Sequence, residues 1–277
     1  GKDLDLKDFW SSARVLVKQA SSVAHQFDKP RVMCETFAGG GWHFGIREQK
    51  WMADWQYAMG LNLVCQHAFH YSLRGFRKRD YPPSLSFQQP WWPFSKDLGS
   101  HFARLGYLLT RGKRVVNVLV MHPIESFFAT HEPGGYPWPN DPMNEALKKL
   151  VECLLAHQID FDFGNEVLLK QHGQVQGASL KLGSATYDAV IIPHSLTWRK
   201  STLTTLRKFA ASGGRLYYVE PAPTHLEGEP TDAYGPLLDE AMSLGHWQAP
   251  EFRQCIADLV GPVARRACRV LGNDPHN

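Results

Sequence analysis

The sequence predicts an α/β fold, in which short buried strands alternate with amphipathic helices along the chain. Short apolar runs are separated by segments with helical periodicity, and glycine or proline stands at many of the junctions. Such alternation implies parallel strands joined by crossover helices. The chain has 277 residues, 43% of them hydrophobic and 21% charged, which is a globular composition long enough for two domains. We expect these domains to be residues 1–113 and residues 114–277.

The first half reads as helix, strand, helix, strand, long loop and helix. Val17, Ala20 and Ala24 recur at helical spacing in a segment that starts near Asp5 and ends before Pro30. The other elements follow in order: a strand at Arg31–Cys34, a helix at Arg47–Gly60, a strand at Leu61–Ser72, a loop to about Asp97 and a helix at Ser100–Gly112. Two parallel strands are too few to form a complete sheet buried on both faces, so this half is interpreted as the end of a larger fold.

The second half reads as an open parallel sheet with helices between its strands. Strands are expected at Arg114–Pro123, Ile159–Glu166, Ala189–Pro193 and Arg215–Pro221. Helices are expected at Met143–Gln158, Ser201–Gly214 and Pro236–Gly245, and near Ile256. This succession is typical of an open α/β sheet of about 140 residues, within the usual size of a domain.

Composition and charge argue against several classes of protein. The net charge of +3 is small and the basic residues form no stripe, so we expect no nucleic-acid partner. No apolar run approaches the roughly 20 residues of a membrane span, so we expect no membrane partner. The five cysteines are scattered without CxxC spacing, which disfavours a disulfide framework and a cysteine zinc site.

Glu35 is the first candidate for chemistry. It follows an apolar strand, and in parallel α/β folds function gathers at the carboxyl ends of strands. Three glycines at 39–41 then free the backbone to approach a ligand closely, and Trp42 and His43 come next. The sequence therefore predicts a binding pocket at Glu35. A surface acid followed by a plain turn is the structural alternative.

The second strand ends in a long loop that mixes polar groups with aromatic rings. Flat rings and hydrogen-bonding side chains together suit a sugar ligand. His67 and His70 are alternatively metal ligands, although three-residue spacing on a strand would point them to opposite faces. We therefore expect no metal site. The candidate sugar-binding residues are Trp42, His43, His67, His70, Tyr71, Arg74, Gln89, Trp91 and Trp92.

Glycoside cleavage usually needs two carboxyl groups. Glu35 is one candidate, and no other acid of the first half stands at a matching strand end. Asp80 lies in the loop, Glu48 and Asp54 fall on a predicted helix, and Glu125 follows the first strand of the second half.

Three stretches of the sequence resemble a known family. "ASSVAHQFDKPRVMCETFAGGGW", "MADWQYAMGLNLVCQHAFHYS" and "FQQPWWPFSKDLGSHFARLGYLLTRGKRVVNVLVMHP" resemble the seventh and eighth strand regions and the last barrel helix of multidomain α-L-rhamnosidases. The chain from Val116 resembles the amidotransferase-like domain that follows the barrel there and in barrel β-galactosidases. The resemblance implies the last two strands of a (β/α)8 barrel followed by a flavodoxin/amidotransferase-like parallel α/β domain.

The resemblance also implies a function and partners. Glu35 matches the strand-seven catalytic carboxylate, as base or nucleophile, in a fragment of a hydrolase that cleaves O-glycosidic bonds of plant or microbial polysaccharides, α-L-rhamnosides among them. The partners would be the carbohydrate substrate and the remaining barrel and β-sandwich domains, and we also expect a homo-oligomer. The second half lacks a G-x-C-x-G elbow and would not be a glutaminase. No cofactor is expected, and this sequence does not support a structural calcium ion. It does not assign a location, although a periplasmic or secreted complete protein is compatible with it.

Two other functions stay open. A non-catalytic carbohydrate-binding or oligomerisation module would use the same aromatic loop without a second carboxylate. A small-ligand α/β protein would use strand ends of the second half, such as Asn165, Glu166 and His194. No G-x-G-x-x-G or G-x-x-x-x-G-K-[ST] phosphate loop supports the latter.

Overall fold

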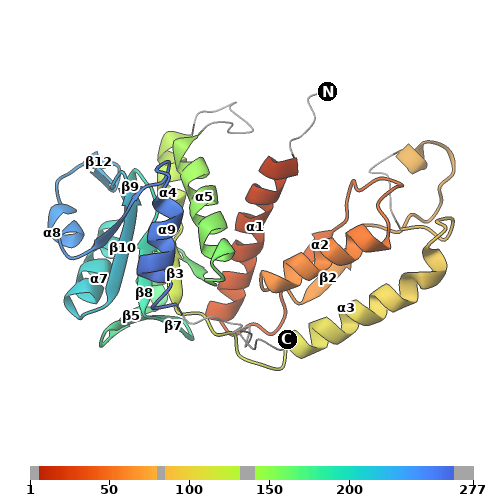
Figure 1. Cartoon of the computed structure of the whole chain (residues 1–277), viewed down its shortest axis with the longest axis horizontal. Coiled ribbons are helices and arrows are strands. Elements are labelled where there is room, and N and C mark those ends of the chain that lie inside the picture. The colour runs from red at the N-terminus through yellow and green to blue at the C-terminus, as the bar shows by residue number, and fades with distance from the viewer. Residues whose placement is uncertain (1–5, 80–84, 132–140, 265–277) are drawn as a thin grey trace, which may run out of the picture. The chain divides into compact units, whose positions relative to one another are not determined.

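A computed structural model describes residues 6–79, 85–131 and 141–264, which form two compact units (Figure 1). Unit 1 contains the described residues up to Asp28 and those from Arg114 onward, and unit 2 is Lys29–Lys113. This division differs from the predicted one at the first helix, α1 (Leu6–Gln26), which is part of unit 1. Its polar side chains explain why, since Ser22 and Gln26 hydrogen-bond the backbone of Phe163 in that unit.

Unit 1 is built on a five-stranded parallel sheet. The strand order is β13-β10-β8-β3-β4, and every neighbouring pair is parallel. Counted in chain order, the five strands lie as 2-1-3-4-5, a common order in doubly wound sheets. The strands are β3 (Val118–Met121), β4 (Asp162–Gly164), β8 (Ala189–Ile192), β10 (Arg215–Glu220) and β13 (Met242–His246).

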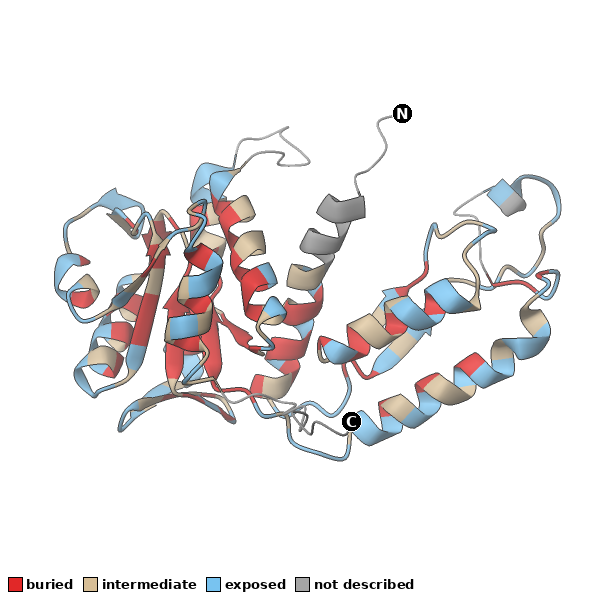
Figure 2. Cartoon of the chain, viewed as in Figure 1, coloured by how far each residue is buried: buried red, intermediate tan, exposed pale blue. Residues whose placement is uncertain are grey.

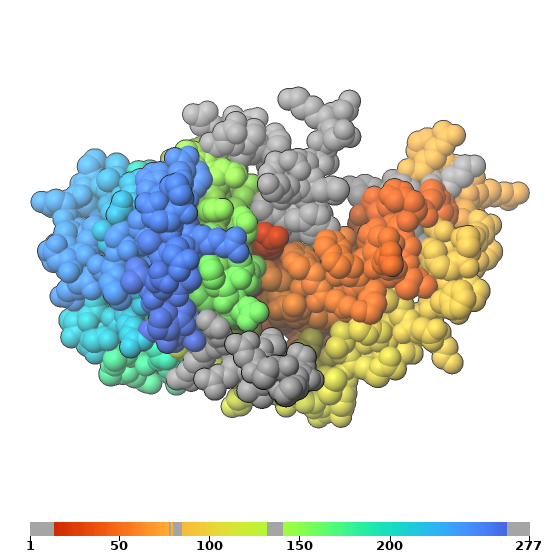
Figure 3. Space-filling view, in the orientation of Figure 1, coloured from red at the N-terminus to blue at the C-terminus, as the bar shows by residue number. Residues whose placement is uncertain are grey.

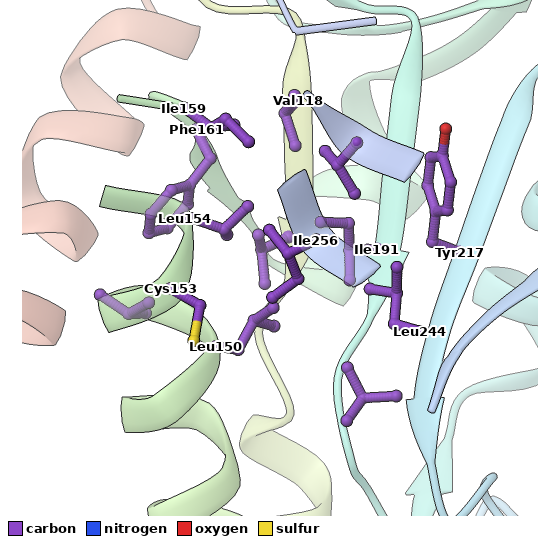
Figure 4. Close-up of a cluster of buried hydrophobic side chains, with 14 of the residues drawn as sticks. Val118, Leu150, Cys153, Leu154, Ile159, Phe161, Ile191, Tyr217, Leu244 and Ile256 are labelled. Carbon is purple, nitrogen blue, oxygen red and sulfur yellow. The ribbon is translucent and has the colours of Figure 1, made fainter. Parts of the chain in front are cut away.

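Both faces of this sheet are covered, which explains why its strands are apolar throughout. Val118 and Val120 of β3 pack on one face and Leu119 and Met121 on the other. The first face, in Figure 4, is covered mainly by α5 (Pro142–Ala156), α9 (Phe252–Cys255) and the π-helical turn η3 (Ile256–Val260). The second is covered by α6 (Glu166–His172), α7 (Lys200–Ala211) and α8 (Gly235–Leu238). Figure 2 shows the central strands as almost continuously buried.

Shorter elements complete unit 1. Helix α4 (Ile124–Thr130) follows β3. An antiparallel sheet joins β5 (Gly173–Gln176), β6 (Ser179–Leu182) and β7 (Ala185–Tyr187), and a second small sheet joins β9 (Thr197–Trp198), β11 (His225–Leu226) and β12 (Glu229–Pro230).

The helix predicted at Pro236–Gly245 is wrong beyond Leu238. The chain from Met242 to His246 is instead the edge strand β13, because it pairs with β10 in the parallel sheet. Its helical periodicity did not reveal this pairing, which joins residues distant in the chain.

Unit 2 contains two parallel strands and two helices packed on one side of them. The strands are β1 (Met33–Thr36) and β2 (Leu63–Gln66), and the helices are α2 (Ile46–Ala58) and α3 (Ser95–Leu109). Phe37, Ala53, Tyr57, Leu98 and Phe102 form the core between them. The space-filling view shows the surfaces of α2 and α3 in contact (Figure 3). The described part of the loop between β2 and α3 includes the 3-10 turns η1 (Gly75–Arg79) and η2 (Trp92–Phe94).

Candidate functional site

Glu35 lies within strand β1, one residue before its end, and not just after the strand as predicted. The side chains of Cys34 and Thr36 point toward α2, because Gln56 donates a hydrogen bond to Thr36 Oγ1 at 3.1 Å and contacts Cys34 Sγ at 3.8 Å. Side chains alternate along a strand, so Met33 and Glu35 point to the opposite face. Glu35 is exposed there.

The face that carries Glu35 is open among the residues that the structure describes. Strand β2 pairs in register with β1, which puts Leu63 beside Met33 and Cys65 beside Glu35. The exposed fractions are 60% for Met33 and 40% for Leu63, which is high for apolar residues of a sheet. This small sheet is therefore covered on one face only.

The backbone conformation and close packing of the segment after β1 explain why it contains three glycines. Gly39 and Gly41 have φ of 68° and 75°, values that residues with a side chain rarely adopt. At Gly40, an added Cβ would lie 2.9 Å from Cγ of Phe44, so the Phe44 ring occupies the space of a side chain. The bare chain thus allows a tight loop, from which Trp42 and His43 project as exposed side chains.

The aromatic loop after β2 approaches this segment. Gln89 is buried and its Nε2 donates a hydrogen bond to the carbonyl oxygen of Trp42 at 2.9 Å. Trp91 lies next to Gly45, since a Cβ there would be 3.9 Å from Trp91 Cδ1. The ring centroids of Trp91 and Trp92 are 6.3 Å apart. The structure therefore joins the two loops through Trp42, Gln89 and the tryptophan pair.

The other predicted sugar-binding residues are less well assembled. His67 continues the strand pairing, because its backbone N–H donates to the carbonyl oxygen of Thr36 at 2.8 Å, and its side chain is partly buried. The buried Nδ1 of His70 has no hydrogen-bond partner among the described residues. Tyr71 and Arg74 are exposed, and no contact recorded for the described residues links either side chain to the tryptophans.

Three residues of this region were missed by the sequence argument. Phe69 packs against Trp92 with ring centroids 5.5 Å apart. Phe44 fills the space at Gly40, and Gln49 donates to the Phe44 carbonyl oxygen at 3.2 Å. The aromatic run "HAFHY" was a signal for Phe69, whereas nothing local distinguishes Gln49 from other helix residues.

The other acids considered in unit 2 have structural partners. Glu48 accepts a hydrogen bond from the Gly45 N–H at 3.0 Å and caps α2. Asp54 pairs with Lys50 and His101; burial raises the pKa of Asp54, but the hydrogen bonds from these two partners outweigh it and lower the pKa. Asp80 lies outside the described residues.

The polar groups at the strand ends of unit 1 form hydrogen bonds or ion pairs within that unit. Asn165 caps α6 by accepting from the N–H groups of Val167 and Leu168. Glu166 is buried, which raises its pKa, and accepts hydrogen bonds from Thr202 at 2.5 Å and the Arg199 N–H at 2.7 Å. His194 Nδ1 lies 3.2 Å from the Pro221 carbonyl oxygen. Glu125 forms an ion pair with Arg199.

Two surface hollows on the described part of the chain lie away from Glu35. One lies along α2 and is lined by Arg47, Trp51 and Trp55 among others, and one lies beside the Glu125–Arg199 pair of unit 1. In the same ranges, no three His, Cys, Asp or Glu side chains converge in a way that could hold a metal ion. None of the described helices combines the length and the apolar composition needed to cross a membrane.

Glycoside hydrolases are among the solved structures that resemble this chain. They include a rhamnosidase from Novosphingobium sp. PP1Y, with 17% identity, a TM-score of 0.51 and coverage of 88% of this chain and 21% of that one. A GH42 exo-carrageenase from Bacteroides ovatus has 11% identity and a TM-score of 0.52, with coverage of 87% and 32%. A GH42 β-galactosidase from G. stearothermophilus has 13% identity and a TM-score of 0.50, with coverage of 79% and 32%.

At these identities the likeness shows the fold alone. The chain spans between a fifth and a third of the length of these structures, with coverage of 21% and 32% at the two ends. No protein-family model and no curated protein sequence matches the chain.

Proposed function

We propose that this chain is part of a glycoside hydrolase, with unit 2 as the last two strands of a (β/α)8 barrel and Glu35 as one catalytic carboxylate. The single observation that carries the proposal is the exposed Glu35 near the carboxyl end of β1, on the uncovered face of a parallel sheet. In a (β/α)8 barrel the helices cover the outside and alternate side chains point inside, with active sites at the carboxyl ends of the strands.

The uncovered face supports the barrel assignment. The two-stranded parallel sheet leaves the apolar side chains of Met33 and Leu63 exposed on one face, a surface that a neighbouring part of a larger fold would bury. The remaining six strands of a barrel would cover these side chains and close both sheet edges. The proposed partners are therefore the rest of the barrel and, from the resemblance of the sequence to multidomain α-L-rhamnosidases alone, a β-sandwich domain of the same enzyme.

The strand order of unit 1 supports a flavodoxin-like, amidotransferase-like domain. Its 2-1-3-4-5 arrangement is that of flavodoxin-like sheets. The polar strand-end groups Asn165 and Glu166 are engaged within the unit, which favours a structural or oligomerising role over ligand chemistry.

The proposed chemistry needs a second carboxyl group across the scissile bond. Glu35 would act as base or nucleophile, and an acid from an earlier barrel strand would protonate the leaving oxygen. Trp42 and the Trp91–Trp92 pair would pack against sugar rings. Buried ring nitrogens without partners among the described residues, Nδ1 of His70 and Nε1 of Trp91, favour a polar ligand nearby, because such groups are rarely left unpaired.

Glu35→Gln in the complete enzyme is the decisive experiment. Hydrolysis of a panel of aryl glycosides, rhamnosides included, should fall by at least about 10³-fold, because a neutral amide cannot act as base or nucleophile. Substrate binding should persist. Glu48→Gln is the matched control, since a capping box accepts glutamine at this position. Retained turnover in Glu35→Gln would refute the assignment.

A non-catalytic carbohydrate-binding or oligomerisation module is the second candidate. The observation in its favour is that each of the other acids weighed within the described part of unit 2, Glu48 and Asp54, is already bound to a neighbour. Binding of oligosaccharides without turnover by the complete protein would support this candidate over the first.

A further inference from the structure

The segment from Phe37 to Gly45 is held in one conformation by two successive turns. The Gly40 N–H donates to the carbonyl oxygen of Phe37 at 3.2 Å, and the Phe44 N–H donates to that of Gly41 at 3.3 Å. Phe37 itself has a φ of 77°, which is unfavourable for a residue with a side chain. Its ring is buried against Phe44 and Phe102, and this packing keeps Phe37 in place.

Two buried glutamine amides hold this segment from different elements. Gln49 of α2 is 0% exposed and donates to the Phe44 carbonyl oxygen at 3.2 Å. Gln89 of the aromatic loop is 8% exposed and donates to the Trp42 carbonyl oxygen at 2.9 Å. A buried amide without a partner is costly, so each bond resists movement of the carbonyl that it holds. We name this pair the glutamine clamp.

Within the segment held by the clamp, some side chains are buried in the core and others are exposed to solvent. The rings of Phe37 and Phe44 belong to or pack against the core of unit 2. Between them, Trp42 is 40% exposed and His43 is exposed. Because Gln89 holds the Trp42 carbonyl, the backbone from which the indole projects is restrained before any ligand arrives.

We infer that Gln89 is a positioning residue, which orients Trp42 for sugar binding and is not itself a sugar ligand. This inference rests on the proposed function for the identity of the ligand, although the clamp itself does not depend on it. A side chain ordered in advance loses less conformational entropy on binding, which raises affinity. The bond from Gln89 also links the loop after β2 to the loop after β1. Trp42 of the first loop therefore keeps its position relative to Trp91 and Trp92 of the second.

Hydrogen–deuterium exchange of the 277-residue chain tests the clamp without any sugar. Gln89→Glu keeps the shape of the side chain but removes the N–H donor and faces the Trp42 carbonyl with an oxygen. Peptides covering residues 38–45 should exchange about tenfold faster, the effect of roughly 1.4 kcal/mol lost from one hydrogen bond. Gln88→Glu adds the same charge on an exposed neighbour and should leave exchange unchanged. Unchanged exchange in Gln89→Glu would overturn the clamp.

Gln89→Met is the second variant, in case the added charge prevents folding, and it should give the same faster exchange without a charge change. In the complete enzyme, Gln89→Glu should raise the KM for aryl glycosides several-fold with kcat nearly unchanged. Faster exchange with an unchanged KM would overturn the positioning role. If Glu35 proved not to be catalytic, the faster exchange in Gln89→Glu would still be expected. Failure of the proposed function and failure of the clamp can therefore be distinguished.

Discussion

The Nζ atom of Lys18 lies 2.5 Å from Oδ1 of Asp160, although the lysine side chain is completely buried. Arg114 donates to the same carboxylate and also to Asp162, which in turn accepts the Tyr187 hydroxyl at 2.7 Å. These bonds attach α1 to the start of β4. Burial, reinforced by the charge of Arg114 and opposed by the two carboxylates, lowers the pKa of Lys18 to about 8.

This lowered pKa predicts that the folded protein gains stability as pH rises above about 8. The unfolded lysine has the ordinary pKa of 10.5, so between these values the unfolded chain binds more protons. The contribution of Lys18 to the free energy of unfolding should therefore increase with pH in this window, by at most about 1.4 kcal/mol per pH unit. Urea unfolding at pH 8, 9 and 10 measures it. Burial raises the pKa of the Cys34 and Cys153 thiols, which opposes the lysine contribution within this window, and the raised pKa of Tyr187 opposes it above pH 10, where the comparison ends.

Lys18→Met is the variant that isolates this contribution. Methionine fills most of the lysine volume without a titrating group, and Arg114 still neutralises Asp160. The rise in stability between pH 8 and pH 10 should be smaller in this variant than in the wild type. Equal slopes in both proteins would contradict the predicted pKa of Lys18.

His122 predicts a loss of stability on the acid side. Burial lowers its pKa from 6.5 to about 4, and its described neighbours Gln19, Phe127 and Phe163 are uncharged. Between pH 6.5 and pH 4, His122 is protonated in the unfolded chain but neutral in the folded protein. The free energy of unfolding should therefore fall over this range by up to about 3 kcal/mol. His122→Gln should reduce this loss, as measured by denaturant unfolding along the pH series. A variant with the wild-type pH profile would show that other groups cause the loss.

Gly183 and Gly177 offer a matched pair of turn glycines. Both have positive φ, 60° and 58°, but an added Cβ at Gly183 would lie 2.1 Å from the carbonyl oxygen of Gln26, while Gly177 has open space. That carbonyl accepts the Ser184 N–H at 2.7 Å and cannot withdraw freely. Gly177→Ala should cost about 1 kcal/mol for the left-handed backbone alone. Gly183→Ala should cost about 3 kcal/mol or more, and thermal unfolding that ranked them equally would contradict the contact with α1.

The open face of unit 2 predicts self-association of this chain. Met33 and Leu63 are exposed side by side in the β1–β2 register, and contiguous apolar surface tends to be covered in solution. The double substitution Met33→Ser and Leu63→Ser should lower the apparent mass measured by light scattering. Leu108→Ser, at a residue of α3 that is 64% exposed, is the control and should change it less. A wild-type chain that is monodisperse as a monomer would contradict the prediction.

Local pattern was sufficient for most of the long helices and buried strands. Residues 118–121, 189–192 and 216–219 were recognisable because strands buried on both faces form continuous apolar runs. Short elements escaped recognition. β13 and the antiparallel strands β5, β6 and β7 are three to five residues long, and their identity depends on the partner strand rather than on their own composition.

The sequence by itself indicated that Glu35 would stand near the end of a strand and that a glycine-rich segment would follow. Both are properties of neighbouring residues, since strand propensity and positive φ are local. The predicted burial of that strand on both faces is wrong, because Met33 and Glu35 are exposed. Only the tertiary structure decided that Glu35 faces the uncovered side of its sheet, that α1 belongs with the larger unit, and that Gln89 holds Trp42. Each of these depends on contacts between residues far apart in the chain, whose energies exist only once the backbone has brought the partners together.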